Sequence, residues 1–64
     1  MAMTDGFYPG ETVTVYTFDG RVSYLGTVVD IDPCDRIVVR DQMEGVEELH
    51  SIPARFVAHG NAYI

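Results

Sequence analysis

The feature that most constrains this chain is an alternation of apolar and polar residues with a period of two. In residues 11–17, ETVTVYT, the side chains of Val13 and Val15 fall on one face of an extended chain, and Tyr16 falls on the other. A Pro-Gly pair precedes this segment and an Asp-Gly pair follows it, and both pairs favour turns. A half-buried β-strand has this pattern, so the sequence predicts an all-β fold.

Four more segments have strand-like patterns. The sequence predicts strands over residues 24–32, 36–42, 46–52 and 58–64, with residues 43–45 as a connection and one helical turn over 53–57. The helical turn begins at Pro53, and proline suits the first position of a helix. We expect a single domain over residues 1–64, because a chain of this length forms one domain at most, with residues 1–7 as an N-terminal tail.

The hairpin between the second and third predicted strands has one register that keeps its apolar residues on one face. Ile31 then lies opposite Ile37 and Val29 opposite Val39, because a shift by one residue would mix the two faces. The connection is a three-residue loop that ends at Asp35, and the last residue of such a loop typically adopts a left-handed conformation. Aspartate tolerates that conformation, so we expect a positive φ there.

This register divides the other residues of the hairpin between water and the core. It places Asp32 beside Arg36 as a surface ion pair, and it turns Val28 and Val38 toward water. The predicted core consists of Val13, Val15, Val29, Ile31, Ile37, Val39, Ile52 and Val57.

The charge of the chain limits its partners. The formal net charge is −6, and seven of the ten acidic residues lie between Asp30 and Glu48. Only Arg36 and Arg40 oppose them there, so the segment carries seven negative and two positive charges, a local charge of −5. Such a field repels phosphate backbones, so nucleic acid is not expected as a partner.

The sequence favours a cytoplasmic protein that has no part in a membrane. Its first residues lack the basic region and apolar stretch of a signal peptide. No apolar run approaches the ~20 residues of a membrane-spanning helix. The single cysteine, Cys34, cannot form an intrachain disulfide and suits a reducing compartment.

The end of the chain resembles the end of a Src-homology-3 (SH3-like) domain. In SIPARFV, Ile52 and Pro53 begin a tight helical turn, and the pair Phe56-Val57 leads into the last strand. The segments YPGETVTV, LGTVVDID and RIVVRD are similar to the strand layout of the Tudor and KOW branch of that superfamily. The resemblance implies an all-β fold, a five-stranded SH3-like small barrel with one short 3-10 turn before the last strand.

The chain departs from the ligand-binding motifs of this superfamily. It has no tryptophan, the long acidic loop after the first strand is nearly absent, and Phe56 stands where the motif has tyrosine. Proline-rich peptides are recognised in grooves lined with aromatic side chains. We therefore expect neither a proline-rich peptide nor a methylated side chain as the ligand.

No residue pattern predicts catalysis, a cofactor or a metal. The stretch DIDPCD lacks the glycine and glutamate that a calcium loop needs at its sixth and twelfth positions. Cys34, His50 and His59 lack the spacing of a zinc site. We expect both histidines to be structural or surface residues, Cys34 to be an unreactive thiol, and the protein not to be an enzyme, because no motif pairs a nucleophile with a base.

The aromatic residues give the most specific functional prediction. Tyr16, Phe18 and Phe56 are expected to face outward and form a partner-binding surface, because aromatic side chains dominate binding hot spots. Charged residues at the rim of such a surface set the rate of encounter. The expected acidic rim consists of Glu44, Glu47 and Glu48. These residues predict a small non-enzymatic protein-interaction module, an adaptor or small subunit of a larger assembly, and they leave a homo-oligomer open.

The acidic segment supports an alternative. It is either a solvated face or a surface that imitates the charge of nucleic acid, as in an acidic inhibitor of phage or plasmid type that blocks a basic site on a host protein. Salt distinguishes the two functions, because an apolar contact tolerates salt whereas an electrostatic one weakens.

Overall fold

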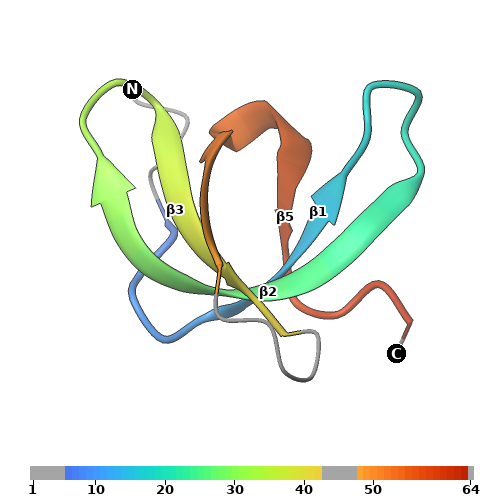
Figure 1. Cartoon of the computed structure of the whole chain (residues 1–64), viewed down its shortest axis with the longest axis horizontal. Coiled ribbons are helices and arrows are strands. Elements are labelled where there is room, and N and C mark those ends of the chain that lie inside the picture. Colours follow the sequence, from blue (N-terminus) through green and yellow to red (C-terminus); the bar gives the residue numbers. More distant parts are fainter. Residues whose placement is uncertain (1–5, 43–47, 64) are drawn as a thin grey trace.

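The computed structural model describes residues 6–42 and 48–63, and these ranges form one curved, antiparallel sheet. The strands are β1 (Thr12–Tyr16), β2 (Val22–Asp32), β3 (Arg36–Asp41), β4 (Leu49–Pro53) and β5 (Val57–His59), and a 3-10 turn, η1 (Ala54–Phe56), joins the last two. Their order across the sheet is β4-β3-β2-β1-β5. Figure 1 shows β2 bending along its length, so that the sheet curves around its concave face. The predicted all-β fold, with five strands and a 3-10 turn before the last one, is confirmed.

The tip of the β2–β3 hairpin has the predicted geometry. Ile31 lies opposite Ile37, and Asp35 has a φ of 61°. The carbonyl of Asp35 accepts a hydrogen bond of 2.9 Å from the N–H of Ala54, the first residue of η1. The hairpin tip therefore lies beside the 3-10 turn, and Figure 1 shows the β1–β2 turn on the other side of η1.

The predicted ion pair at this tip does not form, although Asp32 does lie opposite Arg36. The guanidinium of Arg36 donates instead to Ser51 on β4, to its Oγ at 2.9 Å and to its carbonyl at 2.8 Å. The carboxylate of Asp32 accepts the N–H of Cys34 at 2.8 Å. Arg36 therefore helps to join β3 to β4, while Asp32 shapes the loop.

A bulge at Val29 overturns the rest of the predicted register. Val28 lies opposite Val39 and Asp30 lies opposite Val38, so Val29 is the extra residue on β2. The bulge resets the alternation, and Val28 points into the core with 1% of its surface exposed, whereas Val29 is only half-buried. The predictions that Val29 lies in the core and that Val28 faces water were therefore wrong.

The core lies between the strands and η1. Its buried apolar residues are Val13, Val15, Val28, Ile37, Val39, Ala54 and Val57. Ile31 and Ile52, which we expected in the core, are partly buried and pack against it. Ala54 was not expected there, and it is buried because η1 folds its side chain against the strands.

The last strand is shorter than predicted, because the chain turns at Gly60, which has a φ of 80°. The residues beyond it are held by Thr14, whose hydroxyl donates to the Gly60 carbonyl at 2.8 Å and accepts the N–H of Ala62 at 3.0 Å. Thr14 is 1% exposed. The segment after β5 therefore covers the face of β1 opposite the core.

The start of the described chain is held by a cluster of three residues: Phe7, Glu11 and His59. The Glu11 carboxylate, 8% exposed, accepts the N–H of Tyr8 at 3.2 Å and pairs with Nδ1 of His59. The ring of Phe7 stacks on His59 with centroids 4.0 Å apart and packs against the core. Phe7, which we expected to lie in a tail, is thus part of the folded domain.

Candidate functional site

An exposed cluster, here called the aromatic corner, joins the β1–β2 turn to η1. It consists of Phe18, Asp19, Arg21, Arg55 and Phe56. The rings of Phe18 and Phe56 meet edge to face, with centroids 5.7 Å apart and an interplanar angle of 68°. Phe18 is nevertheless 95% exposed, while Phe56 is half-buried. The structure therefore brings together two of the three aromatic residues that the sequence predicted for a binding surface.

The β1–β2 turn explains why Phe18 projects into water. The N–H of Thr17 donates to the Arg21 carbonyl at 2.8 Å, and the N–H of Gly20 donates to the Thr17 carbonyl at 3.1 Å. Gly20 has a φ of 83°, which suits glycine, and the Thr17 hydroxyl donates to the Asp19 carboxylate. These bonds close the turn around its backbone, so the Phe18 side chain at its tip has only Phe56 as a ring contact among the described residues.

The charges of the aromatic corner are only partly matched among the residues that the structure describes. Nε of Arg21 lies 3.3 Å from a carboxylate oxygen of Asp19, and both side chains are exposed. The guanidinium of Arg55 lies 4.9 Å from the centroid of the Phe56 ring, a cation–π contact. Arg55 forms no ion pair with any residue in the described ranges. Sequence reasoning did not identify Arg55, and the signal for it was its position in the turn beside Phe56.

The other predicted site residues do not join this corner in the described part of the chain. Tyr16, at the end of β1, is half-buried, and its ring contacts neither Phe18 nor Phe56. Glu48 is exposed and lies 3.7 Å from His50, next to β4. Glu44 and Glu47 lie outside the described residues.

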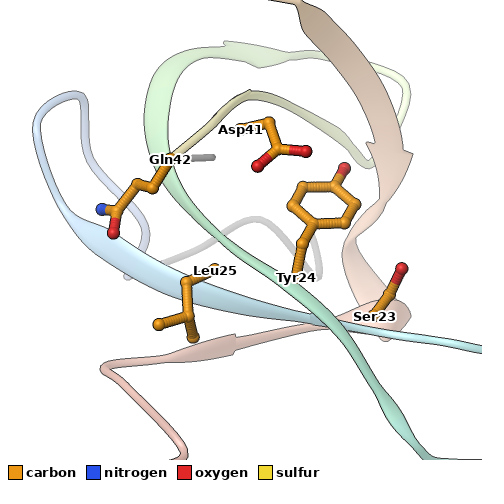
Figure 2. Close-up of a pocket in the computed structure, with 5 residues that line it drawn as sticks. All are labelled: Ser23, Tyr24, Leu25, Asp41 and Gln42. Atoms are coloured by element: carbon orange, nitrogen blue, oxygen red, sulfur yellow. The ribbon is translucent and has the colours of Figure 1, made fainter. Parts of the chain in front are cut away.

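A second feature is an open cavity of about 350 Å³ between the start of β2 and the end of β3. It is lined by Ser23, Tyr24, Leu25, Asp41 and Gln42. Figure 2 shows the Tyr24 ring and the Asp41 carboxylate on one side, with the Gln42 amide turned away from both. The Gln42 amide has a structural role, because its Nε2 donates a hydrogen bond to Thr27 Oγ1 at 3.0 Å.

Tyr24 is the chemically unusual residue of this cavity. Its phenolic oxygen is buried and has no hydrogen-bond partner in residues 6–42 and 48–63. Burial of the ring raises the pKa of Tyr24, and the negative charge of Asp41 raises it further. The phenol therefore stays protonated at neutral pH and can act as a donor, but not as a base. We predicted no cavity of this kind; the one signal for it was Gly26, because a glycine within a strand marks a close approach of backbones.

Gly26 creates this close approach between β2 and β3. A Cβ atom at Gly26 would lie 2.2 Å from Cγ1 of Val39 and 2.9 Å from the carbonyl oxygen of Arg40. Only glycine fits at this position without displacing β3. Gly26 thus fixes how closely β2 packs on β3 next to Leu25 and Asp41, which line the cavity.

The described ranges contain neither a metal-binding group of side chains nor a membrane-spanning helix. No group of three or more His, Cys, Asp or Glu side chains there is arranged to hold a metal ion, and Cys34 is exposed at the hairpin tip. Within the same ranges, no helix has the length and apolar character that crossing a bilayer requires.

Comparison of the chain with protein-family models, with curated proteins and with solved structures finds no match. The function therefore has to be inferred from the site itself.

Proposed function

We propose that this protein is a small non-enzymatic protein-interaction module, an adaptor or small subunit of a larger assembly, whose contact surface is the aromatic corner. One observation carries the proposal: Phe18 is 95% exposed on a turn that hydrogen bonds hold closed. Covering a phenylalanine side chain yields roughly 1.5–3 kcal/mol, which this fold leaves unused. A partner that packs on Phe18 and Phe56 would gain that free energy.

Two further features support the proposal. The strand order, the 3-10 turn and the motif from Ile52 to Val57 fit a small barrel of the SH3-like class. The exposed free thiol of Cys34 fits a reducing compartment.

The acidic inhibitor has less support from the described side chains. Asp30 and Asp32 both use a carboxylate oxygen to accept a backbone N–H of the hairpin, at 2.8 Å in each case. These two residues therefore have a local structural role that accounts for their presence. Loss of binding at high salt would favour the inhibitor instead.

The test immobilises three proteins, the wild type, Phe18→Ser and Tyr63→Ser, and compares the proteins that each captures from a cell lysate at low and at high salt. Tyr63 is the matched control, because it is another exposed aromatic residue (73%) and lies outside the corner. We expect partners that the wild type and Tyr63→Ser retain at high salt and that Phe18→Ser loses. Equal capture by all three proteins, or capture only at low salt, would contradict the proposal.

A further inference from the structure

The aromatic corner has the chemistry to pair with itself, and we infer that its occupant is a second copy of this chain. This inference rests on the proposed function, because it names the partner of the same surface. The corner holds an exposed ring, an exposed carboxylate and an arginine without an ion pair among the described residues, all within two short segments, 17–21 and 54–56. A surface that carries both members of each contact can meet its own copy around a two-fold axis.

The charges favour this occupant. The side chains of Asp19 and Arg21 are 63% and 84% exposed, and Arg55 has no ion pair in the described ranges. The corner contains Arg21 and Arg55 as well as Asp19, so it carries charges of both signs. A carboxylate can accept several hydrogen bonds, so Asp19 can keep Arg21 and also receive a second guanidinium. In a symmetric pair, Arg55 of each copy would meet Asp19 of the other.

The rings give the same arrangement its apolar centre. Phe18 contacts Phe56 through an edge-to-face geometry, and almost all of its remaining surface is open. Two copies related by a two-fold axis would cover both Phe18 rings at once, with the Arg55–Asp19 pairs at the rim. This is the usual anatomy of an interface, with aromatic residues in the centre and charges around them.

The contact should be weak and should depend on salt in a characteristic way. The corner has five residues, far fewer than the roughly 20–30 a side of a standard interface, so the contact belongs to the small class, under about 1,200 Å² in total. Two copies of net charge −6 repel each other, and salt screens this repulsion most strongly between charges that are farther apart than the Debye length, about 8 Å at 0.15 M salt. Moderate salt screens this repulsion more than it weakens the short-range pairs, so association should strengthen as salt first rises. An acidic decoy on a basic partner would show the opposite trend.

The first experiment uses the pure protein. Sedimentation equilibrium over a hundredfold dilution from millimolar protein measures self-association, and amide chemical shifts over the same range locate it. We expect a monomer–dimer equilibrium, with concentration-dependent shifts gathered in residues 17–21 and 54–56. Phe18→Ser should weaken the dimer by about thirtyfold, the effect of losing a hot spot, while Tyr63→Ser leaves it unchanged.

The second experiment exchanges the charges. Arg55→Asp alone and Asp19→Arg alone should each weaken association by about tenfold, because the two-fold axis repeats every contact. An equal mixture of the two variants should associate as well as the wild type, because both contacts then join opposite charges. Arg40→Asp is the control for Arg55→Asp, because it changes the net charge of the chain by the same amount at an exposed position outside the corner. If Asp19→Arg disturbs the fold in amide spectra, Arg55→Asp mixed with wild type still reports on the contact.

A protein that stays monomeric at millimolar concentration would overturn the inference, as would a dimer that survives Phe18→Ser or whose shifts lie elsewhere. The proposed function has a separate outcome. A monomer that captures other proteins through Phe18 would refute the second copy and keep the interaction module. A protein that neither self-associates nor captures partners through Phe18 would refute both.

Discussion

Two residues near the ends of β1, Glu11 just before it and Phe18 in the turn after it, depart in opposite ways from the rule that charges face water and rings face the core. Before the strand, the Glu11 carboxylate is buried; after it, the Phe18 ring is almost fully exposed. Glu11 finds its partners within the chain, in the N–H of Tyr8 and the ring of His59. Phe18 has a single ring contact among the described residues, and 95% of it is exposed. Contacts within the fold account for the burial of Glu11, whereas the exposure of Phe18 suggests a contact with another molecule.

This contrast separates stability from binding. A buried charge that has partners is costly to disturb, because removing one partner leaves the other unsatisfied. An exposed ring contributes little to folding, because it is already in water. Substitutions before β1 should therefore act on unfolding, and substitutions after it should act on association.

The largest effect is expected from Glu11→Ala. It removes the acceptor of the Tyr8 N–H and the partner of His59, so it should lower the free energy of unfolding by about 2 kcal/mol. That is a large share of the total of roughly 5 kcal/mol that a domain of this size has. Urea melts measure it. Glu11→Gln is the control, because it keeps an acceptor for the Tyr8 N–H and should therefore cost less. If the wild type and both variants are equally stable, the Glu11 carboxylate does not stabilise the fold.

The boundary between the core and the corner can be tested at two neighbouring residues. Val57 is buried and Phe56 is half-buried beside Phe18. We expect Val57→Ala to cost on the order of 2 kcal/mol and Phe56→Ala to cost less, although phenylalanine is larger. Urea melts of the two variants decide the order. A greater loss in Phe56→Ala would place its ring in the core and weaken the case for the corner.

A smaller effect is expected from Thr14→Val, which preserves shape and removes the hydroxyl. The carbonyl of Gly60 and the N–H of Ala62 would lose their partner, at a cost of about 1 kcal/mol. Hydrogen exchange of the Ala62 amide should accelerate as well. If that amide exchanges at the wild-type rate, the segment after β5 is held by something other than Thr14.

The smallest effect on stability is expected from Phe18→Ser. Surface substitutions away from special features usually change stability by less than about 0.5 kcal/mol, and a ring that is 95% exposed meets that condition. Thermal or urea unfolding checks this directly. A clear loss of stability would mean that Phe18 supports the turn or Phe56, and the contrast between the two sides of β1 would then fail.

Local sequence signals predicted much of the fold. The alternation around Val13 and Val15 gave the first strand, and the loop ending at Asp35 gave its left-handed residue, because both depend on neighbours in the chain. The bulge at Val29 could not be predicted in this way. A single inserted residue shifts the alternation, and the choice between Val28 and Val29 depends on how β2 curves around the core.

The candidate site was predicted only as a set of separate outward residues. The sequence indicated that Phe18 and Phe56 face outward. Their contact joins positions that are 38 residues apart in the sequence, so it depends on the folded structure. The burial of Glu11 was missed for the same reason, since its partner His59 lies at the other end of the chain. Contacts between distant segments carry no periodic signal.

The hairpin tip offers a practical route to these measurements. Cys34 is the only cysteine of the chain, it is exposed, and the next residue is hydrogen-bonded to the first residue of η1. A maleimide dye or a nitroxide attached there would need no engineered cysteine and would leave the core untouched. Such a label would sit beside η1, which carries Arg55 and Phe56 of the corner, so energy transfer or spin–spin broadening between two labelled chains would report their approach directly.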